Sequence, residues 1–429
     1  MFFSLVLSLS SSRINAFWSF DGHLNEQNLQ YNGISINNIS YISPGITGYG
    51  SALNLNANFS QYVLINPSVT LNLSMRSFTF EFWINPYSLP TNDRGMIGQC
   101  QSMNASRCLH LTLRSGKVRM SFFSNACDGT KILSINTWYH LTFVYDYSRT
   151  SQTIYIDGII ECNRTSAPPL QVFNSTFTPM TIGYTSPLAP YYFDGLIDQL
   201  SVVEWAKSSS EILNDATLVA RYSFENYSYD DTGPNGMNGF GRNITFGSNG
   251  ILFNENNSYF QSTGFVLLGI SNRSYSFSIW IYPFLTNQTT ILYVYENSFS
   301  VNRWCLSSLN FDSQGRIQAQ SRLDSGIINV LGPVISSNVW THIVQTYSQS
   351  NGMSLYINGS FYNRSSTFNY RSSETPLTLR LGNVFDDLNG VCVTRSIGQI
   401  ERQYQGWMDE FRVYSRELTS TDAQLLSTR

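Results

Sequence analysis

Charged residues are scarce in this chain. They make up 12% of its 429 residues, and the formal net charge is −3 at pH 7. Such a balance gives no electrostatic reason to expect nucleic acid or an anionic membrane surface as a partner. No apolar run reaches about 18 residues, the length that a membrane-spanning helix requires. The composition therefore predicts neither nucleic-acid binding nor a membrane span.

Histidines and closely spaced cysteines are scarce as well. The chain has four histidines, and none of its six cysteines forms a Cys-x-x-Cys pair. This argues against a zinc ribbon and a thioredoxin-type redox site. His140 and His342 each follow a tryptophan by two positions within an alternating run. We interpret both as packed strand residues, with a catalytic base or metal ligand as the alternative.

The six cysteines divide evenly between the two halves of the chain. Four lie in the first half and two in the second, which favours disulfides closed within each half in an oxidising compartment. The second half allows one pair, Cys305–Cys392. The first half allows three connectivities, of which we choose Cys100–Cys108 with Cys127–Cys162.

The chain begins with a short apolar run, Met1–Leu9, followed by polar residues and Ala16. This pattern predicts a signal peptide over residues 1–16, although a positive charge near the start is missing. A buried first strand is the alternative. Thirteen Asn-x-Ser/Thr sequons are candidate glycosylation sites, which require a surface position in a secreted protein. Their asparagines are Asn38, Asn58, Asn72, Asn104, Asn163, Asn174, Asn226, Asn243, Asn256, Asn272, Asn287, Asn358 and Asn363. The combination predicts a secreted, extracellular glycoprotein.

One pattern occurs twice. Trp138 opens an alternating run, a polar turn and a second run that ends at Asp157-Gly158, and Trp340 opens the same series, which ends at Asn358-Gly359. Apolar–polar alternation indicates strands, and Asx-Gly pairs favour tight hairpins. A chain of this length exceeds one ordinary core. We therefore predict two tandem all-β domains, residues 17–217 and 218–429.

Further matched blocks support the duplication. An opening strand at Phe17–Asp21 corresponds to Arg221–Glu225, and Phe78–Ile84 corresponds to Tyr275–Ile281. A last block with Asp198 matches one with Asp409, and a short helix is predicted after each, over 208–214 and 419–426. The tryptophans of these blocks are interpreted as core residues. They are Trp83, Trp138, Trp280 and Trp340.

Four of these motifs, in the same order and in both halves, resemble the laminin G-like jelly-roll domains of the concanavalin A-like lectin/glucanase superfamily. The matching residues are Phe80, Phe82, Trp83, Trp138, His140, Tyr155, Asp157, Gly158, Gly195, Asp198 and Leu200, with Phe277, Ile279, Trp280, Trp340, His342, Tyr356, Asn358, Gly359, Gly406, Asp409 and Phe411 in the second copy. The resemblance implies two antiparallel β-sandwiches of the jelly-roll type. It does not fix the function, because this superfamily includes lectins, adhesion modules, spacers and enzymes.

The enzymes of this resemblance carry a Glu-x-Asp-x-x-Glu cluster on one strand, because retaining glycoside hydrolysis needs two carboxyl groups about 5 Å apart. The chain has no such cluster. Asp409 and Glu410 are adjacent and would point to opposite faces of a strand. We therefore predict a non-catalytic protein and no catalytic residues, with a glycan-processing enzyme as the third interpretation.

Many domains of this resemblance bind one Ca²⁺ between the last strand and the loop after the first. Calcium prefers six to eight oxygen ligands, which loops rich in Asp, Asn and Gly supply. The candidate ligands are Asp21 and Asp198 in the first domain, and Asp230, Asp231, Asn235 and Asp409 in the second. The alternative is that these carboxylates cap turns by accepting backbone hydrogen bonds.

The loops before the last strand differ most between the two copies, and binding sites favour such loops. Tyr191, Tyr192, Arg402 and Tyr404 are therefore the predicted contact surface. The sequence favours recognition of a glycan or an extracellular protein as the role, with a structural or adhesive spacer as the second interpretation. The sequence leaves the oligomeric state open.

Overall fold

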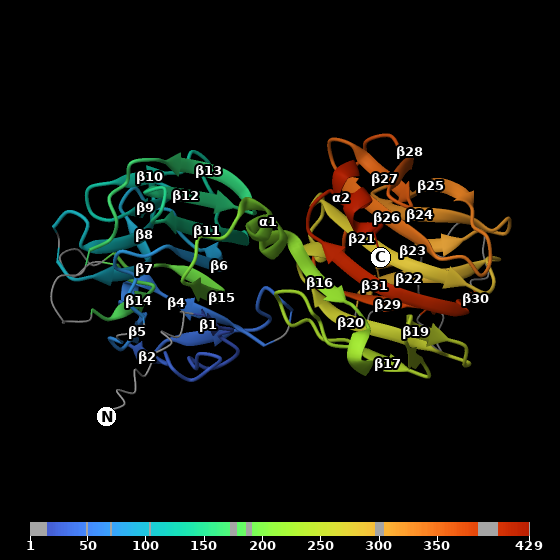
Figure 1. Ribbon diagram of the computed structural model, residues 1–429, viewed down its shortest axis with the longest axis horizontal. Helices are drawn as coiled ribbons and strands as arrows, with labels where there is room; N and C mark the ends of the chain where they lie inside the picture. The colour runs from blue at the N-terminus through green and yellow to red at the C-terminus, as the bar shows by residue number, and fades with distance from the viewer. Residues whose placement is uncertain are drawn as a thin grey trace, which may run out of the picture. The chain divides into compact units, whose positions relative to one another are not determined.

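The computed structural model describes residues 15–48, 50–68, 71–102, 104–171, 178–185, 191–296, 304–384 and 402–428. The chain divides into two compact units (Figure 1). Unit 1 comprises Met1–Ile46 and Gly50–Ala216, and unit 2 comprises Thr47–Tyr49 and Thr217–Arg429. Each unit is a sandwich of two antiparallel sheets, which confirms the predicted fold class.

The first sheet of unit 1 is eight-stranded. Its order is β13 (Ile159–Arg164), β12 (Ser151–Ile156), β11 (Tyr139–Asp146), β6 (Phe78–Pro86), β15 (Gly195–Val203), β4 (Ala52–Leu55) and β3 (Ser40–Ile42), with β1 (Asn15–Trp18) paired to β15. The second sheet is seven-stranded. Its order is β10 (Ala126–Asp128), β9 (Lys117–Ser121), β8 (Cys108–Arg114), β7 (Arg94–Cys100), β14 (Met180–Ile182), β5 (Tyr62–Ile65) and β2 (Gly33–Ile36). A 3₁₀ turn, η1 (Ala57–Phe59), precedes β5, and helix α1 (Ser209–Thr217) follows β15.

Unit 2 repeats this architecture. One sheet has the order β18 (Thr245–Gly247), β19 (Gly250–Phe253), β31 (Gly406–Tyr414), β21 (Tyr275–Pro283), β26 (Thr341–Ser348), β27 (Gly352–Ile357) and β28 (Ser360–Arg364), with β16 (Leu218–Tyr222) paired to β31. The other has the order β17 (Phe240–Arg242), β20 (Tyr259–Phe265), β29 (Leu377–Leu381), β22 (Thr289–Glu296), β23 (Cys305–Phe311), β24 (Arg316–Leu323) and β25 (Gly326–Val334), with β30 (Arg402–Gln403) beside β22. The remaining elements are η2 (Glu225–Tyr227), η3 (Leu267–Gly269) and α2 (Ser420–Leu426).

The alternation of strand β6 shows why these sequences form a sandwich. Phe78, Phe80 and Phe82 point inward and are fully buried in the core of unit 1. Burying one such side chain stabilises the fold by about 1.5–3 kcal/mol. Glu81 and Trp83, the residues between and after them, consequently lie on the opposite face of the sheet.

Both predicted hairpins are present. The turn between β12 and β13 has positive φ at Asp157 (52°) and Gly158 (79°), and Asn358 (48°) and Gly359 (78°) repeat it between β27 and β28. Two consecutive residues with positive φ define the turn whose twist matches that of the flanking strands, and Asx-Gly is the pair that adopts it most readily. The predicted helices are also present, and α2 begins at a capping box between Thr419 and Asp422.

Two predictions about local structure need correction. Trp83 does not belong to the core between the sheets, because it alternates with the inward phenylalanines; its ring lies 5.1 Å from that of His140 on the outer face. Trp280 packs in the same way on His342 and is half-buried. Strand β1 also includes Ala16, which is fully buried opposite Val202, and the domain bounds at Phe17 and residue 217 stay a prediction. The signal peptide itself stays a prediction.

Candidate functional site

The outer face of the seven-stranded sheet in unit 1 carries a group of half-buried tyrosines. Val63 and Ile65 of β5 belong to the core, so Tyr62 points to the outer face. The rings of Tyr184 and Tyr192 stack with centroids 5.0 Å apart and an interplanar angle of 22°. The Tyr62 ring lies 5.1 Å from that of Tyr184 and 6.1 Å from that of Tyr192. We call these three residues the tyrosine platform.

The backbone brings the platform together from distant parts of the sequence. Strand β14 ends at Ile182, and Gly183 then turns the chain with a φ of 85°. Beyond the end of β14, Tyr192 lies beside Gly95 of β7 and forms a parallel bridge with it. The Gly95 amide donates to the Tyr191 carbonyl at 3.0 Å, which fixes this segment against the sheet.

Glycines form the part of the sheet beneath this segment. A Cβ atom at Gly98 would lie 2.7 Å from Cα of Thr185 and 2.8 Å from the carbonyl oxygen of Tyr184. A Cβ at Gly95 would lie 2.6 Å from the Thr185 amide. Any side chain at these two positions would push the Tyr184–Thr185 segment outward. The glycines therefore set the height of the platform above the sheet.

Arg94 of β7 donates to the Tyr192 carbonyl at 3.3 Å, and two further arginines of this sheet form ion pairs within the fold. Arg114 of β8 forms two hydrogen bonds to Asp93, at 2.5 and 2.7 Å, and Arg119 of β9 pairs with Asp128 at 2.8 Å. His110 lies on the outer face of β8 as well, opposite Ser121 of β9, and burial lowers its pKa to about 4, so that it is neutral at pH 7. Stacked aromatic rings with nearby paired polar groups suit the binding of a ligand with flat apolar faces and hydroxyl groups.

The equivalent face of unit 2 has a different surface. Tyr259 of β20 corresponds to Tyr62, but the Arg380 guanidinium lies 3.9 Å from its ring centroid. Arg380 also donates two hydrogen bonds to Gln261, at 2.6 and 3.0 Å. Gln403 of β30, at the position of Tyr192, donates to Ser258. In unit 2, internal contacts of the fold therefore occupy the side chains at the positions where unit 1 has tyrosines at its surface.

The structure places the four predicted contact residues in different environments. Tyr191 and Tyr192 lie at the platform, and Arg402 is exposed at the equivalent place in unit 2. Tyr404 was wrongly predicted: it is fully buried in the core of unit 2 and its hydroxyl donates to the Trp407 carbonyl at 3.0 Å. It occupies the inward position that follows Arg402 and Gln403, as Phe193 follows Tyr192.

Sequence reasoning missed Tyr62 and Tyr184. The alternation Tyr62-Val63-Leu64-Ile65 would have placed Tyr62 on an outer face, but it gives no sign of its partners. Tyr184 comes next to Tyr62 only because β14 pairs with β5, with Thr181 opposite Leu64. This pairing joins strands more than 100 residues apart, and no local pattern reports it.

The predicted calcium ligands of unit 2 make internal hydrogen bonds. Asp231 accepts from the backbone amides of Arg221 (2.8 Å), Gly233 (2.8 Å) and Met237 (2.9 Å). Asn235 donates its amide to two carbonyl groups, Asp409 accepts from the Glu410 amide, and Asp230 is exposed. Burial raises the pKa of Asp231 even though these amides favour its charged form.

The unit 1 candidates behave similarly. Asp198 is buried and accepts hydrogen bonds from the backbone amides of Ile46 (2.8 Å) and Gln199 (2.9 Å). It lies on β15 between the residues that pair with β4 and those that pair with β1. Asp21 accepts from the Ser51 amide at 3.1 Å. Burial raises the pKa of Asp198 well above its ordinary value, and the nearby charge of Asp21 acts in the same direction. Calcium binding in either unit stays a prediction, which melting curves in calcium and in chelator would test.

The cysteines form disulfides Cys100–Cys108 and Cys127–Cys162, the connectivity favoured from the sequence. Cys305 is also disulfide-bonded, and Cys392 lies outside the described residues, as does the sequon asparagine Asn174. Within the described ranges, the group with metal-ligand proximity is Cys100, Cys108 and His110. Its two sulfurs are joined to each other, so the group does not offer two thiolates to a metal.

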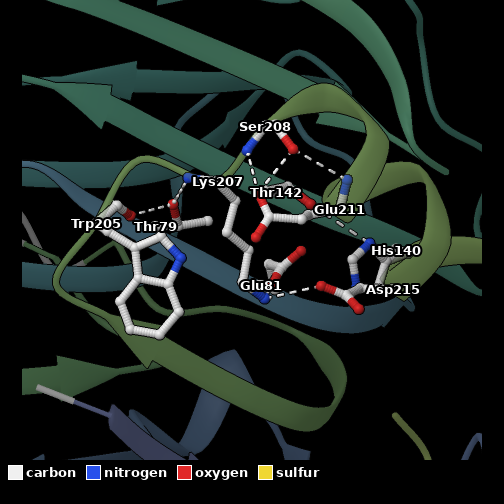
Figure 2. A network of polar contacts seen from close by, with 9 residues as sticks. All are labelled: Thr79, Glu81, His140, Thr142, Trp205, Lys207, Ser208, Glu211 and Asp215. Atoms are coloured by element: carbon white, nitrogen blue, oxygen red, sulfur yellow. Dashed lines mark hydrogen bonds and ion pairs between the residues drawn. The ribbon is translucent and has the colours of Figure 1, made fainter. Parts of the chain in front are cut away.

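A second polar cluster lies on the outer face of the eight-stranded sheet, beneath α1 (Figure 2). The Lys207 ammonium lies between two carboxylates: it contacts Glu81 of β6 and donates to Asp215 of α1 at 2.8 Å. His140 lies beside this cluster, and burial lowers its pKa to about 3. Glu81 is 4% exposed.

This cluster does not form a glycosidase site. Hydrolysis needs two carboxyl groups that reach the sugar from open solvent, whereas Glu81 and Asp215 both face the same lysine under a helix. The lysine segment is also held to the sheet, because the Lys207 amide donates to the Thr79 hydroxyl at 3.1 Å. We infer that the cluster fastens α1 to the sheet.

Burial raises the pKa of Glu81 to about 7, whereas the two carboxylates raise the pKa of Lys207. Because the folded state holds the Glu81 proton more tightly than the unfolded state, it binds more protons between about pH 4.5 and 7. The contribution of Glu81 to stability should therefore decline as pH rises through this window, by at most about 3 kcal/mol. Hydrogen exchange of the α1 amides at pH 5 and pH 7.5, corrected for intrinsic rates, measures this change. A Glu81→Gln variant should lose it, and an unchanged pH dependence in that variant would contradict the assignment.

No helix in the described part of the chain is long and apolar enough to cross a membrane.

No curated protein sequence matches the chain significantly. Among solved structures, domain 4 of AbnA, a GH43 extracellular arabinanase from Geobacillus stearothermophilus, is 21% identical, with 46% of this chain and 95% of that one covered and a TM-score of 0.37. The binding domain of Paraclostridial Mosquitocidal Protein 1 is 11% identical, with 87% and 97% covered and a TM-score of 0.38. A putative carbohydrate binding protein from Bacteroides ovatus is 18% identical, with 35% and 44% covered and a TM-score of 0.30. These scores carry no argument about function.

The family comparison is more informative. The profile described as Concanavalin A-like lectin/glucanases superfamily matches residues 56–213 and 254–424. The two matches cover more than half of the chain and fall one in each unit. They also contain the residues quoted for the resemblance in both copies, Phe80 to Leu200 and Phe277 to Phe411. The chain therefore belongs to the concanavalin A-like lectin/glucanase superfamily, with one laminin G-like domain in each of its two units.

Proposed function

We propose that this chain is a secreted, non-catalytic glycan-binding protein, and that the tyrosine platform of unit 1 is its binding surface. The observation that carries the proposal is the stack of three half-buried rings at 5.0–6.1 Å on the outer face of a sheet. Tyrosine offers a sugar both an apolar face and a hydroxyl group that hydrogen-bonds. Family membership supports the ligand class, since the superfamily includes lectins.

Two further observations support secretion. The chain contains intrachain disulfides, which persist in oxidising compartments. Every sequon asparagine in the described ranges except Asn72 is exposed, as glycosylation requires. A structural spacer would share both properties. What favours a binding protein over a spacer is that unit 1 keeps its rings at the surface, whereas Arg380 covers the equivalent ring in unit 2.

A matched pair of variants tests the proposal. Tyr62→Ala removes one ring of the platform, and Tyr259→Ala removes the equivalent ring from unit 2. Truncating a contact tyrosine costs about 2 kcal/mol of binding free energy, or roughly 30-fold in affinity. We expect this loss for Tyr62→Ala and none for Tyr259→Ala, measured by titration with the oligosaccharide that binds most strongly on an immobilised glycan array. Saturable binding that responds equally to both substitutions, or no saturable binding to any glycan, would remove the basis for the platform.

A further inference from the structure

Two sequons lie beside the tyrosine platform. Asn58 is in η1, four residues before Tyr62. Asn38 follows Ile36 by two residues, and Ile36 is opposite Tyr62 in the pairing of β2 with β5. From the spacing within and between strands, both asparagines lie within about 15 Å of Tyr62 along the chain.

The two sequon turns are held together by hydrogen bonds. The Gln61 side chain donates to the Asn38 carbonyl at 2.8 Å, and the Asn37 side chain donates to the Ser60 carbonyl at 2.9 Å. Asn38 and Asn58 are exposed, and within the described residues their own side-chain amides make no hydrogen bond. Both amides are therefore free to accept a glycan without loss of an internal contact.

Unit 2 repeats this arrangement. Arg242 is opposite Tyr259 in the pairing of β17 with β20, and the sequon asparagine Asn243 follows it directly. Asn256 precedes Tyr259 by three residues, and the Asn243 side chain donates to its carbonyl at 3.0 Å. Two sequons thus border the same tyrosine position in both units, although the offsets differ by one residue in each case. In both units, therefore, the two turns next to this tyrosine position each carry a candidate glycosylation site.

We propose that N-linked glycans on Asn38 and Asn58 cover the tyrosine platform and limit its access to external glycans. The proposal rests on the proposed function of the platform. An N-linked glycan is bulky and is tethered within reach of the rings, so it competes at a high local concentration with a free ligand. Its sugars have the same chemistry as the ligand class that the platform suits. In unit 2 the same pair of glycans would border a ring that Arg380 already covers, so their removal exposes no new platform.

The test compares three forms of the full chain secreted from the same glycosylating cells: wild type, Asn38→Gln/Asn58→Gln, and the matched control Asn243→Gln/Asn256→Gln. Peptide mass spectrometry first measures occupancy of all four asparagines. The probe is the oligosaccharide that binds the enzymatically deglycosylated protein most strongly on a glycan array. We expect Asn38→Gln/Asn58→Gln to bind it at least tenfold more tightly than wild type, and the control to match wild type.

Two results would overturn the regulation while leaving the platform intact. One is unoccupied Asn38 and Asn58 in the secreted wild type. The other is equal affinity of wild type and Asn38→Gln/Asn58→Gln when both sites are occupied in wild type. Failure of the proposed function gives a different result: the deglycosylated protein then binds no glycan, or its binding does not change in Tyr62→Ala. That outcome overturns the regulation as well.

Discussion

Lys207→Met is expected to destabilise unit 1 by about 3–5 kcal/mol at pH 8, the range for removing one partner of a buried ion pair. The substitution leaves Glu81, which is 4% exposed, without its cation. At pH 5 the cost should be smaller, because burial raises the pKa of Glu81 to about 7 and an uncharged carboxyl needs no counter-ion. The pH dependence of the loss therefore distinguishes a lost ion pair from a simple packing defect.

Hydrogen exchange of the β6 and α1 amides in the full chain measures this effect locally, without assuming that the two units unfold together. Lys131→Met is the matched control, since Lys131 is 44% exposed and its nitrogen lies 3.8 Å from Asp157. Exposed pairs contribute about 0–1 kcal/mol. Glu81→Leu/Lys207→Met should recover much of the loss, because replacing a whole buried pair by apolar side chains is often neutral. Equal protection in wild type and Lys207→Met at pH 8 would mean that the cluster does not fasten α1.

The second large effect is expected from removing both stacked rings of the platform. Tyr184→Ala/Tyr192→Ala should weaken glycan binding at least 100-fold, which corresponds to about 2.7 kcal/mol. The two single effects need not add, because the rings contact each other at 5.0 Å and each supports the other in its orientation. Titration of the wild type and of both single variants with the same oligosaccharide measures the coupling.

Stability must be separated from binding in this experiment. Tyr184 and Tyr192 are half-buried, so their removal should leave the core of unit 1 folded. Hydrogen exchange of β7 and β8 checks this. Tyr362→Ala in unit 2 is the control for loss of an exposed tyrosine, because its side chain is 49% exposed on β28. Full affinity in Tyr184→Ala/Tyr192→Ala would place the glycan elsewhere.

Local signals in the sequence were sufficient for the strands, the hairpins and the duplication, whereas the β-sandwich arrangement was implied by the resemblance to laminin G-like domains. Alternation placed the phenylalanines of β6 inward, and Asx-Gly pairs located the hairpins after β12 and β27. The same alternation, followed strictly, would have put Trp83 on the outer face. The core interpretation of Trp83 rests on its position within a strongly alternating strand, but the structure buries its ring on the outer face, against His140.

The site was less accessible from the sequence, for a physical reason. Tyr191 and Tyr192 form an aromatic pair in a variable loop, which the sequence shows, but Tyr62 comes from β5 and Tyr184 follows β14. These contacts depend on sheet order, which period-two patterns do not report. Tyr404 shows the opposite error. As an aromatic residue near a loop it is predicted at the surface, but its side chain points into the core just before β31 begins.

The most direct test of the central claim is a crystal structure of the full chain with the oligosaccharide that binds it most tightly. The account predicts a sugar ring lying against the Tyr184 and Tyr192 rings on the outer face of the seven-stranded sheet, with Tyr62 at its edge. A sugar bound away from these three residues, while Tyr184→Ala/Tyr192→Ala keeps its affinity in solution, would contradict it.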